Sequence, residues 1–223
     1  MKKYSIVFLT GLLAGVFIGL GGAVNLAVLT IEGLDLVLSK FIGSFLFATG
    51  LFGITTFSLS LYTGKVGSIV NKDYKFLLDL LVMFLGNVLG TFLLAQLLLG
   101  TRNGGVLKEL ASGIIQSKYD DNWVSILLLA IGCGFLMEFA VQGFNQLKDK
   151  PSVRYISVFL GVILFILLGF EHVIANFFYL FISNNYQPLA IIYFFLMLIG
   201  NSLGGILLAL PLKVYKDYLK TNS

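Results

Sequence analysis

The residues of this chain best suited to chemistry lie in one stretch, Gly169-Phe170-Glu171-His172-Val173-Ile174-Ala175-Asn176. Apolar runs at 156–168 and 177–182 flank it, and together the two runs are long enough to cross a bilayer. Between them stand a glutamate, an asparagine and the one histidine of the chain. Ionisable groups at membrane depth cost roughly 2.5–3.5 kcal/mol each on insertion scales, so they usually face a partner or a water-filled path. The stretch indicates either a polar site on a transport pathway or a polar cluster that bonds to neighbouring helices.

The composition is that of an integral membrane protein. The 223 residues are 58% hydrophobic and 12% charged, whereas a soluble domain carries about 25% charged residues. The polar stretches are too short to form a second domain, so we expect one transmembrane channel domain over residues 1–223. Met1-Lys2-Lys3 resembles the start of a signal peptide, but the apolar segment behind it, 6–29, is too long for one and predicts a retained first helix.

Several function classes are disfavoured by the same counts. The single cysteine, Cys133, cannot form a disulfide or a thiol–metal site within one chain and predicts a packing role. One histidine, one cysteine and no carboxylate pair at metal-ligand spacing argue against an enzyme, a metal or another cofactor. The formal charge of +4 does not indicate nucleic-acid binding, because the basic residues flank apolar segments and point to membrane topology.

Six segments are long enough to span a membrane as helices, at about 20 residues a span: 6–29, 41–62, 76–99, 123–145, 155–181 and 189–210. The longest connection, 100–121, contains a stretch from Lys108 to Ile115 that could form a short interfacial helix. The lysines and arginines divide eleven to four between the two sides, which accounts for all fifteen. The richer side should be cytoplasmic. We therefore expect a protein of the cell inner membrane with both termini in the cytoplasm. The members of the richer side are Lys2, Lys3, Lys65, Lys72, Lys75, Lys148, Lys150, Arg154, Lys213, Lys216 and Lys220, against Lys40, Arg102, Lys108 and Lys118.

A short motif repeats in the two halves of the chain. The third segment contains Gly86-Asn87-Val88-Leu89-Gly90 and the sixth contains Gly200-Asn201-Ser202-Leu203-Gly204, 114 residues further on. A half with three spans must re-enter the membrane upside down, so the pattern predicts two inverted three-helix repeats, about 1–105 and 106–223. Inverted repeats are typical of transporters and channels, with the pathway near the midplane where the repeats meet.

The second spans of the halves also correspond. Leu61-Tyr62-Thr63-Gly64 closes the second segment, and Thr63 and His172 lie 109 residues apart, close to the offset of the other motif. Thr63-Gly64 with Gly67 behind it is a helix breaker, and broken helices present backbone N–H groups and helix ends to a buried ligand. We therefore expect the second and fifth helices to be broken and to meet across a pore. Alternatively, Thr63-Gly64 ends a helix at the cytoplasmic surface, as the neighbouring Lys65 would allow.

Glycines repeat every four residues in the first segment. Gly11, Gly15 and Gly19, with Ala23 behind them, form a small-residue face along which a second helix can approach closely. The partner helix could belong to the same subunit or to a neighbouring one.

These motifs resemble those of the formate/nitrite transporter family. The run from Gly169 to Asn176 looks like its GFEHS-x-AN signature, and Leu61-Tyr62-Thr63-Gly64 looks like its L-F-T-G loop. Asn122-Trp123-Val124 is similar to the start of its fourth helix, and the two Gly-Asn pairs are similar to its own. The resemblance extends in order over the whole chain. It implies an all-α membrane protein with an aquaporin-like fold, assembled as a homopentamer with a pore in each subunit.

The resemblance also implies roles for particular residues. Members of the family pass small monovalent anions or their weak acids, of the formate and nitrite class, with hydrosulfide, lactate or acetate as alternatives. The implied substrate pathway comprises His172, Thr63, Asn176, Asn87, Asn201 and Asn122. The implied apolar constrictions comprise Phe47, Leu51, Leu61, Tyr62 and Phe165. Lys108 best matches a vestibule lysine, with Lys118 as the competitor, and Lys65 is a candidate on the inner side.

This chain departs from the family at several positions. Tyr62 replaces a phenylalanine, Lys65 replaces an asparagine, and the segment between Thr63 and Gly86 is short, which truncates the second part of the broken helix. Glu138 stands in the fourth span and has no family role. These changes leave the fold unaffected but bear on the substrate.

Neutralising the anion is the cheaper way through an apolar constriction. A buried charge costs on the order of 20 kcal/mol in the idealised limit and several kcal/mol after relaxation, whereas protonating a weak acid about three pH units above its pKa costs only about 4 kcal/mol. His172 could donate that proton, or as a neutral ring it could hydrogen-bond the passing acid with Thr63 and Asn176 while water supplies the proton. We favour the second, because charge on a buried imidazole is costly. Glu171 is expected to cap loop N–H groups.

Rival functions differ in class. A hydrosulfide channel of the same fold is favoured modestly by the truncated loop. A water or glycerol channel is disfavoured because Pro151, Pro188 and Pro211 are not preceded by asparagine. A membrane enzyme or a structural subunit remains as a third class.

Overall fold

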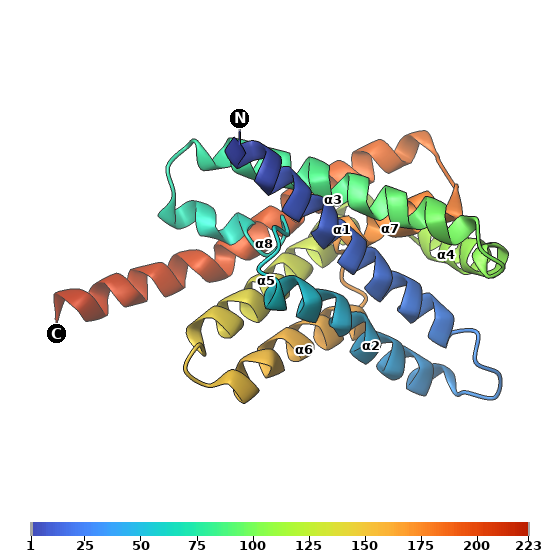
Figure 1. The fold of residues 1–223 in the computed structure, drawn as a ribbon, viewed down its shortest axis with the longest axis horizontal. Coiled ribbons are helices and arrows are strands. Elements are labelled where there is room, and N and C mark those ends of the chain that lie inside the picture. The colour runs from blue at the N-terminus through green and yellow to red at the C-terminus, as the bar shows by residue number, and fades with distance from the viewer. Residues whose placement is uncertain (1, 223) are drawn as a thin grey trace.

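The chain folds as an all-helical bundle with two breaks in its helices. The structure is a computed structural model that describes residues 2–222. Eight α-helices and one 3₁₀ helix follow one another in these residues (Figure 1): α1 Lys2–Val28, α2 Leu36–Thr56, η1 Val66–Asn71, α3 Phe76–Leu99, α4 Gly104–Tyr119, α5 Trp123–Gln146, α6 Pro151–Leu167, α7 Val173–Ser183 and α8 Pro188–Thr221. Within residues 2–222, five helices are long and apolar enough to cross a membrane: α1, α2, α3, α5 and α8. The predicted fold class, an all-α membrane protein with broken second and fifth helices, is confirmed.

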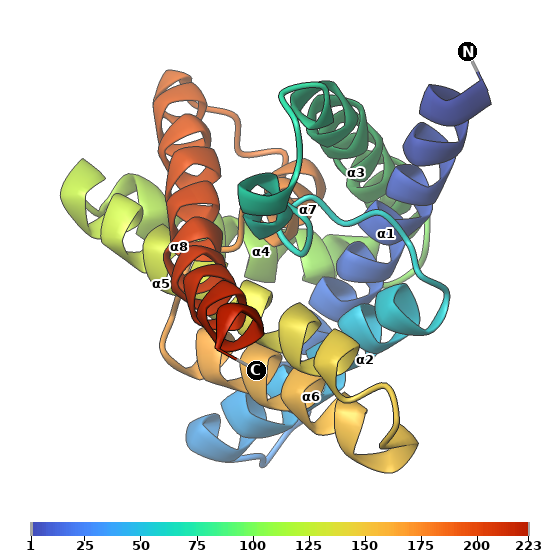
Figure 2. The same cartoon turned by 90° about the vertical axis from the view of Figure 1, so that its left-hand side faces the viewer.

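The two halves are built alike. Helix α1 packs along α3 in the first half, and α5 packs along α8 in the second, while α2 and α6 lie together (Figure 2). The two broken pieces cross between the halves, since α7 packs on α3 of the first half and η1 packs on α8 of the second. Each half therefore supplies the short helix that the other half holds, which is the arrangement an inverted repeat requires.

Glycines set the close spacing of the paired helices. A side chain at Gly15 would collide with the backbone of Asn87 on α3, and one at Gly134 would collide with the backbone of Asn201 on α8. Gly11 likewise lies against the α3 backbone. The glycine row in the first helix thus packs within the subunit, so it does not supply the contact between subunits that was considered for it.

The breaks fall close to the predicted positions but are longer. Helix α2 ends at Thr56 rather than near residue 62, and a non-helical loop leads to η1, the truncated six-residue second part. In the second half α6 ends at Leu167 and α7 begins at Val173. Gly169 turns the chain there with a φ of 67°, a backbone conformation that costs glycine little.

Two helices are longer than expected. Helix α4 covers Gly104–Tyr119 rather than only the stretch from Lys108 to Ile115. Helix α8 continues past residue 210 to Thr221, and its last turns project beyond the bundle (Figure 1).

Candidate functional site

A hydrogen bond joins the two helix breaks at the centre of the protein. The Nε2 atom of His172 lies 2.8 Å from Oγ1 of Thr63, and both residues are buried. His172 is also the N-cap of α7, because its Nδ1 accepts a hydrogen bond from the backbone N–H of Ala175 at 3.0 Å. Since Nδ1 accepts, a neutral imidazole here carries its proton on Nε2 and donates it to the Thr63 hydroxyl. The hydroxyl proton of Thr63 then remains available to another acceptor.

Two buried asparagines hold the breaks in place. The Asn87 side chain accepts from the backbone N–H of Tyr62 and donates to the carbonyls of Gly11 and Ser60, each at 2.8 Å. Asn87 is fully buried. One side chain thus provides hydrogen-bond partners for one backbone N–H and two backbone carbonyls, two of which lie in a loop outside any helix.

Asn201 makes the equivalent set of bonds in the second half. It accepts from the N–H of Val173 at 2.9 Å and donates to the carbonyls of Ala130 and Glu171 at 2.8 and 2.7 Å. The paired Gly-Asn motifs therefore act as structural clamps on the loops that carry Thr63 and His172. Neither asparagine lines the cavities described below.

The equivalent bonds give the true register of the repeat. Asn87 binds the N–H of Tyr62 where Asn201 binds that of Val173, so these two loop residues correspond, 111 residues apart. Leu61 is then the counterpart of His172. The expected correspondence of Thr63 with His172 is wrong by two residues: the two side chains meet because they face each other across the centre.

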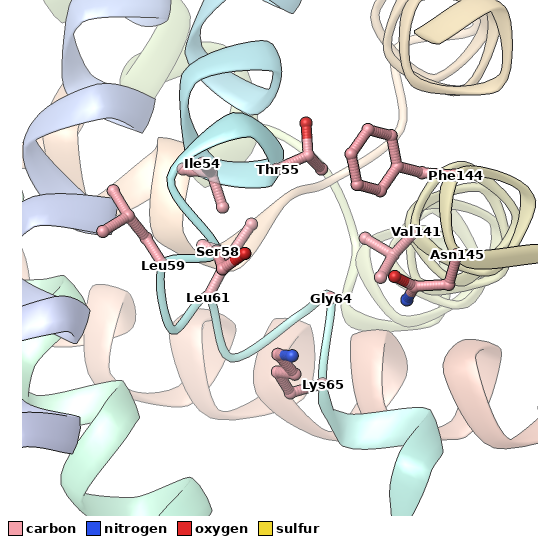
Figure 3. A pocket seen from close by; sticks show the side chains of 10 residues that line it. All are labelled: Ile54, Thr55, Ser58, Leu59, Leu61, Gly64, Lys65, Val141, Phe144 and Asn145. Carbon is pink, nitrogen blue, oxygen red and sulfur yellow. The ribbon is translucent and has the colours of Figure 1, made fainter. Parts of the chain in front are cut away.

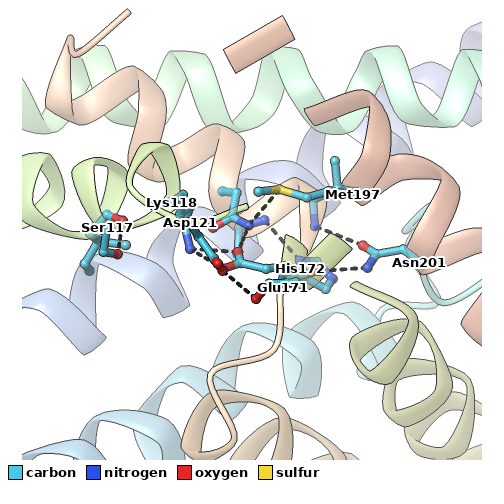
Figure 4. A network of polar contacts seen from close by, with 12 residues as sticks. Ser117, Lys118, Asp121, Glu171, His172, Met197 and Asn201 are labelled. Carbon is cyan, nitrogen blue, oxygen red and sulfur yellow. Dashed lines mark hydrogen bonds and ion pairs between the residues drawn. The ribbon is translucent and has the colours of Figure 1, made fainter. Parts of the chain in front are cut away.

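A polar network surrounds the glutamate of the motif (Figure 4). Lys118 of α4 donates to both oxygens of Glu171 at 2.9 and 2.7 Å, and Asn176 donates to Oε2 at 2.6 Å. Only 12% of the Lys118 side chain and 7% of the Glu171 side chain are exposed. The expectation that Glu171 caps loop N–H groups is wrong: its carboxylate neutralises a buried lysine and orients Asn176, which forms no side-chain bond to His172.

A cavity of about 460 Å³ opens on one side of His172. We call it the outer cavity, since the count of lysines and arginines predicts that it faces the outside; it also contains Asn176 and the cations Lys40 and Lys118. Lys108, by contrast, points from the exposed face of α4 and does not line it. Three further lining residues, Asn25, Ser39 and Lys40, were not among the site residues expected from the sequence. A signal for Lys118 was present: it continues the buried row of α4 formed by Gly104, Leu107, Ala111 and Ile115.

Apolar side chains close the centre. Phe47 and Phe165 line the outer cavity, pack edge to face at 5.8 Å, and Phe165 stacks on the His172 ring at 5.6 Å. Leu51 and Leu61 are buried in the same cluster.

Tyr62, the fifth residue of the expected constriction, lies elsewhere. Its ring packs on Phe84 in a separate cluster, and its hydroxyl lies 2.8 Å from Oγ of Ser202 on α8. Tyr62 therefore anchors its loop to the other half of the repeat.

A smaller cavity of about 70 Å³ lies beyond Leu61 (Figure 3). We call it the inner cavity; the loop residues Ser58, Gly64 and Lys65 line it, opposite Val141 and Asn145 of α5. Lys65 is its charged side chain. Asn122 lies far along α5 from this region and caps the start of that helix, accepting from the N–H groups of Val124 and Ser125. Within residues 2–222 there is no group of three or more His, Cys, Asp or Glu side chains that could hold a metal ion.

Two broken helices that meet at a polar pair, inside inverted three-helix repeats, define a membrane channel or transporter of aquaporin-like architecture. A sequence model of the formate/nitrite transporter family matches residues 2–215, so the chain belongs to that family. Membership confirms that it is a multi-pass transport protein and not an enzyme.

Curated relatives and solved structures agree with this assignment. An uncharacterized transporter of Bacillus subtilis, YrhG, is 26% identical over 197 residues, covering 80% of this chain and 72% of the relative. A formate-nitrite transporter of Plasmodium malariae is 28% identical, covering 97% and 80%. A pentameric formate channel solved with formate bound superimposes with a TM-score of 0.78 at 22% identity, over 100% of this chain and 99% of that one. A second structure, an FNT family ion channel, gives 0.79 at 17% identity, over 93% and 89%.

Proposed function

We propose that this protein passes small monovalent anions of the formate and nitrite class across the membrane as their neutral weak acids. The observation that carries the proposal is that two cavities with lysines adjoin one buried centre. His172 lines the cavity that has two lysines, and Leu61 lines the cavity that has one. The His172–Thr63 pair and a cluster of buried apolar side chains lie at that centre.

Each environment suits one stage of the passage. Lys118 and Lys40 attract the anion into the outer cavity, and Lys65 does so from the inner side. Lys118 carries less free charge than Lys40, because Glu171 neutralises most of it. Because Lys118 lines the outer cavity and Lys108 does not, we place Lys118, rather than Lys108, at the vestibule.

Protonation comes from water in this proposal. The Nδ1 atom of His172 is occupied as an acceptor of the Ala175 N–H, so a second ring proton would break the helix cap. The neutral ring instead keeps the Thr63 hydroxyl oriented, and that hydroxyl can donate to the passing acid. Phe47 and Phe165 beside His172, and Leu51 and Leu61 in the same buried cluster, admit the neutral form and reject the ion, because burial of the ion costs several kcal/mol.

Uptake into liposomes tests the function. Purified protein should carry formate and nitrite faster at an outside pH of about 5 than at about 7, because a tenfold rise in the neutral fraction accompanies each pH unit. Lactate and hydrosulfide belong in the same panel, since they decide between members of the family. Protein-free liposomes measure leakage of the neutral acids, and equal uptake with and without protein would contradict the proposal.

We further propose a homopentamer with a pore in each subunit. The solved formate channel of similar fold is pentameric, and helices α1, α2 and α3 carry large apolar side chains on their exposed faces. Mass measurement in mild detergent should give about five copies of the chain. A stable monomer or tetramer would count against this assembly.

The proposed orientation puts both termini in the cytoplasm of a cell inner membrane. The predicted spans assign eleven of the fifteen lysines and arginines to that side, and the richer side is usually cytoplasmic. Single cysteines at Lys40 and Asn184, introduced after Cys133 is replaced, should react with an impermeant reagent from outside, and one at Lys72 only after the membrane is opened. The reverse labelling pattern would refute the orientation.

A further inference from the structure

A buried glutamate lies outside the pathway described above. Glu138 of α5 is 1% exposed. Its Oε1 accepts a hydrogen bond from Gln142 at 2.8 Å, whereas its Oε2 has no hydrogen-bond partner among the residues described. A carboxylate oxygen buried without a donor is costly at membrane depth unless a proton or a cation neutralises the group.

The repeat shows how unusual this position is. Gly19 and Glu138 are related by the same 119-residue offset as the helix-packing glycines Gly15 and Gly134. Gly67 and Phe178 are related by the 111-residue offset of the two loops.

These four residues form equivalent contacts in the two halves, and each contact pairs a glycine with a large side chain. The glycine lies on the long helix in one half and on the short helix in the other. In one, Gly19 of α1 faces the ring of Phe178 on α7; in the other, Glu138 of α5 faces Gly67 of η1. A Cβ atom at Gly67 would overlap the Glu138 carboxyl group. An apolar contact in one half is therefore matched by a carboxyl group packed directly on the backbone in the other.

The charged groups nearby do not pair with Glu138. Lys65 is the cation whose charge acts on it, but the two form no salt bridge, and Lys65 lines the inner cavity instead. Helix η1 contributes no charged side chain. On α8, Lys213 donates to the carbonyl of Val70, and on α6 Arg154 lies over the ring of Phe144.

We propose that the Glu138 carboxyl group is a proton-binding site that controls the inner end of the pore. With its proton, Glu138 remains packed on Gly67 and η1 stays in place. Without the proton, the carboxylate moves toward Lys65 and water, and the contact between α5 and η1 loosens. Val141, one turn further along α5, packs on Gly64 in the same way. Loosening therefore reaches the loop that carries Leu61 and Lys65, widens the inner cavity, and raises flux as the pH on that side rises.

Infrared spectroscopy tests the proton directly. Wild-type protein in liposomes should show the carbonyl stretch of a protonated carboxyl group at neutral pH, and this band should disappear in E138Q. The matched control is E109Q, since Glu109 is exposed on α4; its band should equal that of the wild type. A neutral-pH band unchanged in E138Q would overturn the proposal, as would the absence of such a band in the wild type.

Flux and hydrogen exchange test the control of the pore. Wild type and E109Q should gain flux as the inner-side pH rises, whereas E138Q should stay low and flat. In Gly67→Ala the methyl group takes the space of the carboxyl group, so the flux should be high at every inner-side pH. Amide exchange of residues 64–71 in the wild type, which needs no variant to fold, should accelerate with pH beyond the intrinsic chemical rate. A wild-type pH profile in E138Q, or exchange that follows the intrinsic rate, would refute control by Glu138.

These readouts also separate this inference from the proposed transport function. The infrared band and amide exchange require no transported anion. If no anion in the panel is carried, the proposed function is refuted. The infrared spectra still show whether the Glu138 carboxyl group holds a proton.

Discussion

His172→Phe is expected to abolish weak-acid flux, or to reduce it strongly, in a protein that still assembles. Phenylalanine fills the ring volume but removes the bond to Thr63 and the cap on the Ala175 N–H. Each buried group left without a partner costs about 1–3 kcal/mol, so a lower unfolding temperature should accompany the loss. Liposome flux and thermal unfolding on the same preparation measure both effects.

His172→Asn separates the two possible roles of the ring. Asparagine keeps a donor and an acceptor but cannot titrate. If the imidazole supplies the proton, this variant should be as inactive as His172→Phe. We expect appreciable flux with an altered pH dependence, because water supplies the proton. Normal flux at every pH in His172→Phe would show that the histidine is only structural.

Asn201→Leu is expected to cause the largest loss of stability. The substitution leaves three backbone groups without a hydrogen-bond partner: the N–H of Val173 and the carbonyls of Ala130 and Glu171. At about 1–3 kcal/mol for each group, the sum is a large part of the stability of an ordinary domain. Flux should fall too, because the bond to the Glu171 carbonyl fixes the residue beside His172. Thermal unfolding and gel filtration in detergent measure the effect.

Two variants place this result in context. Asn145→Leu makes the same exchange at an exposed position of α5 and should leave the unfolding temperature nearly unchanged. Asn87→Leu leaves the three equivalent backbone groups of the first half without a partner. It should lower the unfolding temperature of the protein to a similar degree. An Asn201→Leu protein as stable as Asn145→Leu would contradict the clamp.

Local patterns in the sequence predicted the architecture well. The paired Gly-Asn motifs predicted the inverted halves because glycine spacing and a buried amide impose the same helix contact wherever they occur. The breaks at Thr63-Gly64 and at Gly169 were predicted for a similar reason, since the residues that interrupt a helix act on their own backbone.

Contacts between distant side chains could not be read in the same way. The bond of Tyr62 to Ser202 joins residues in opposite halves. No residue near Tyr62 in the sequence indicates that its hydrogen-bond partner lies on α8. The choice between Lys108 and Lys118 depended on which face of α4 is buried, and motif matching ignored that face. The carboxylate of Glu171 was assigned to loop N–H groups because its true partner lies on a separate helix.

The start of α7 at the centre of the bundle has a consequence for the energy stored across the membrane. A helix N-terminus carries about half a positive elementary charge, and such ends repel hydronium and metal cations from a pore. Each ion that leaked would dissipate about 2.3 kcal/mol for every 100 mV of membrane voltage. In the proposed function, an acid would cross this centre while the membrane keeps its voltage and its sodium and potassium gradients. The short helix thus opposes the entry of cations at a point where the charges of Glu171 and Lys118 cancel each other.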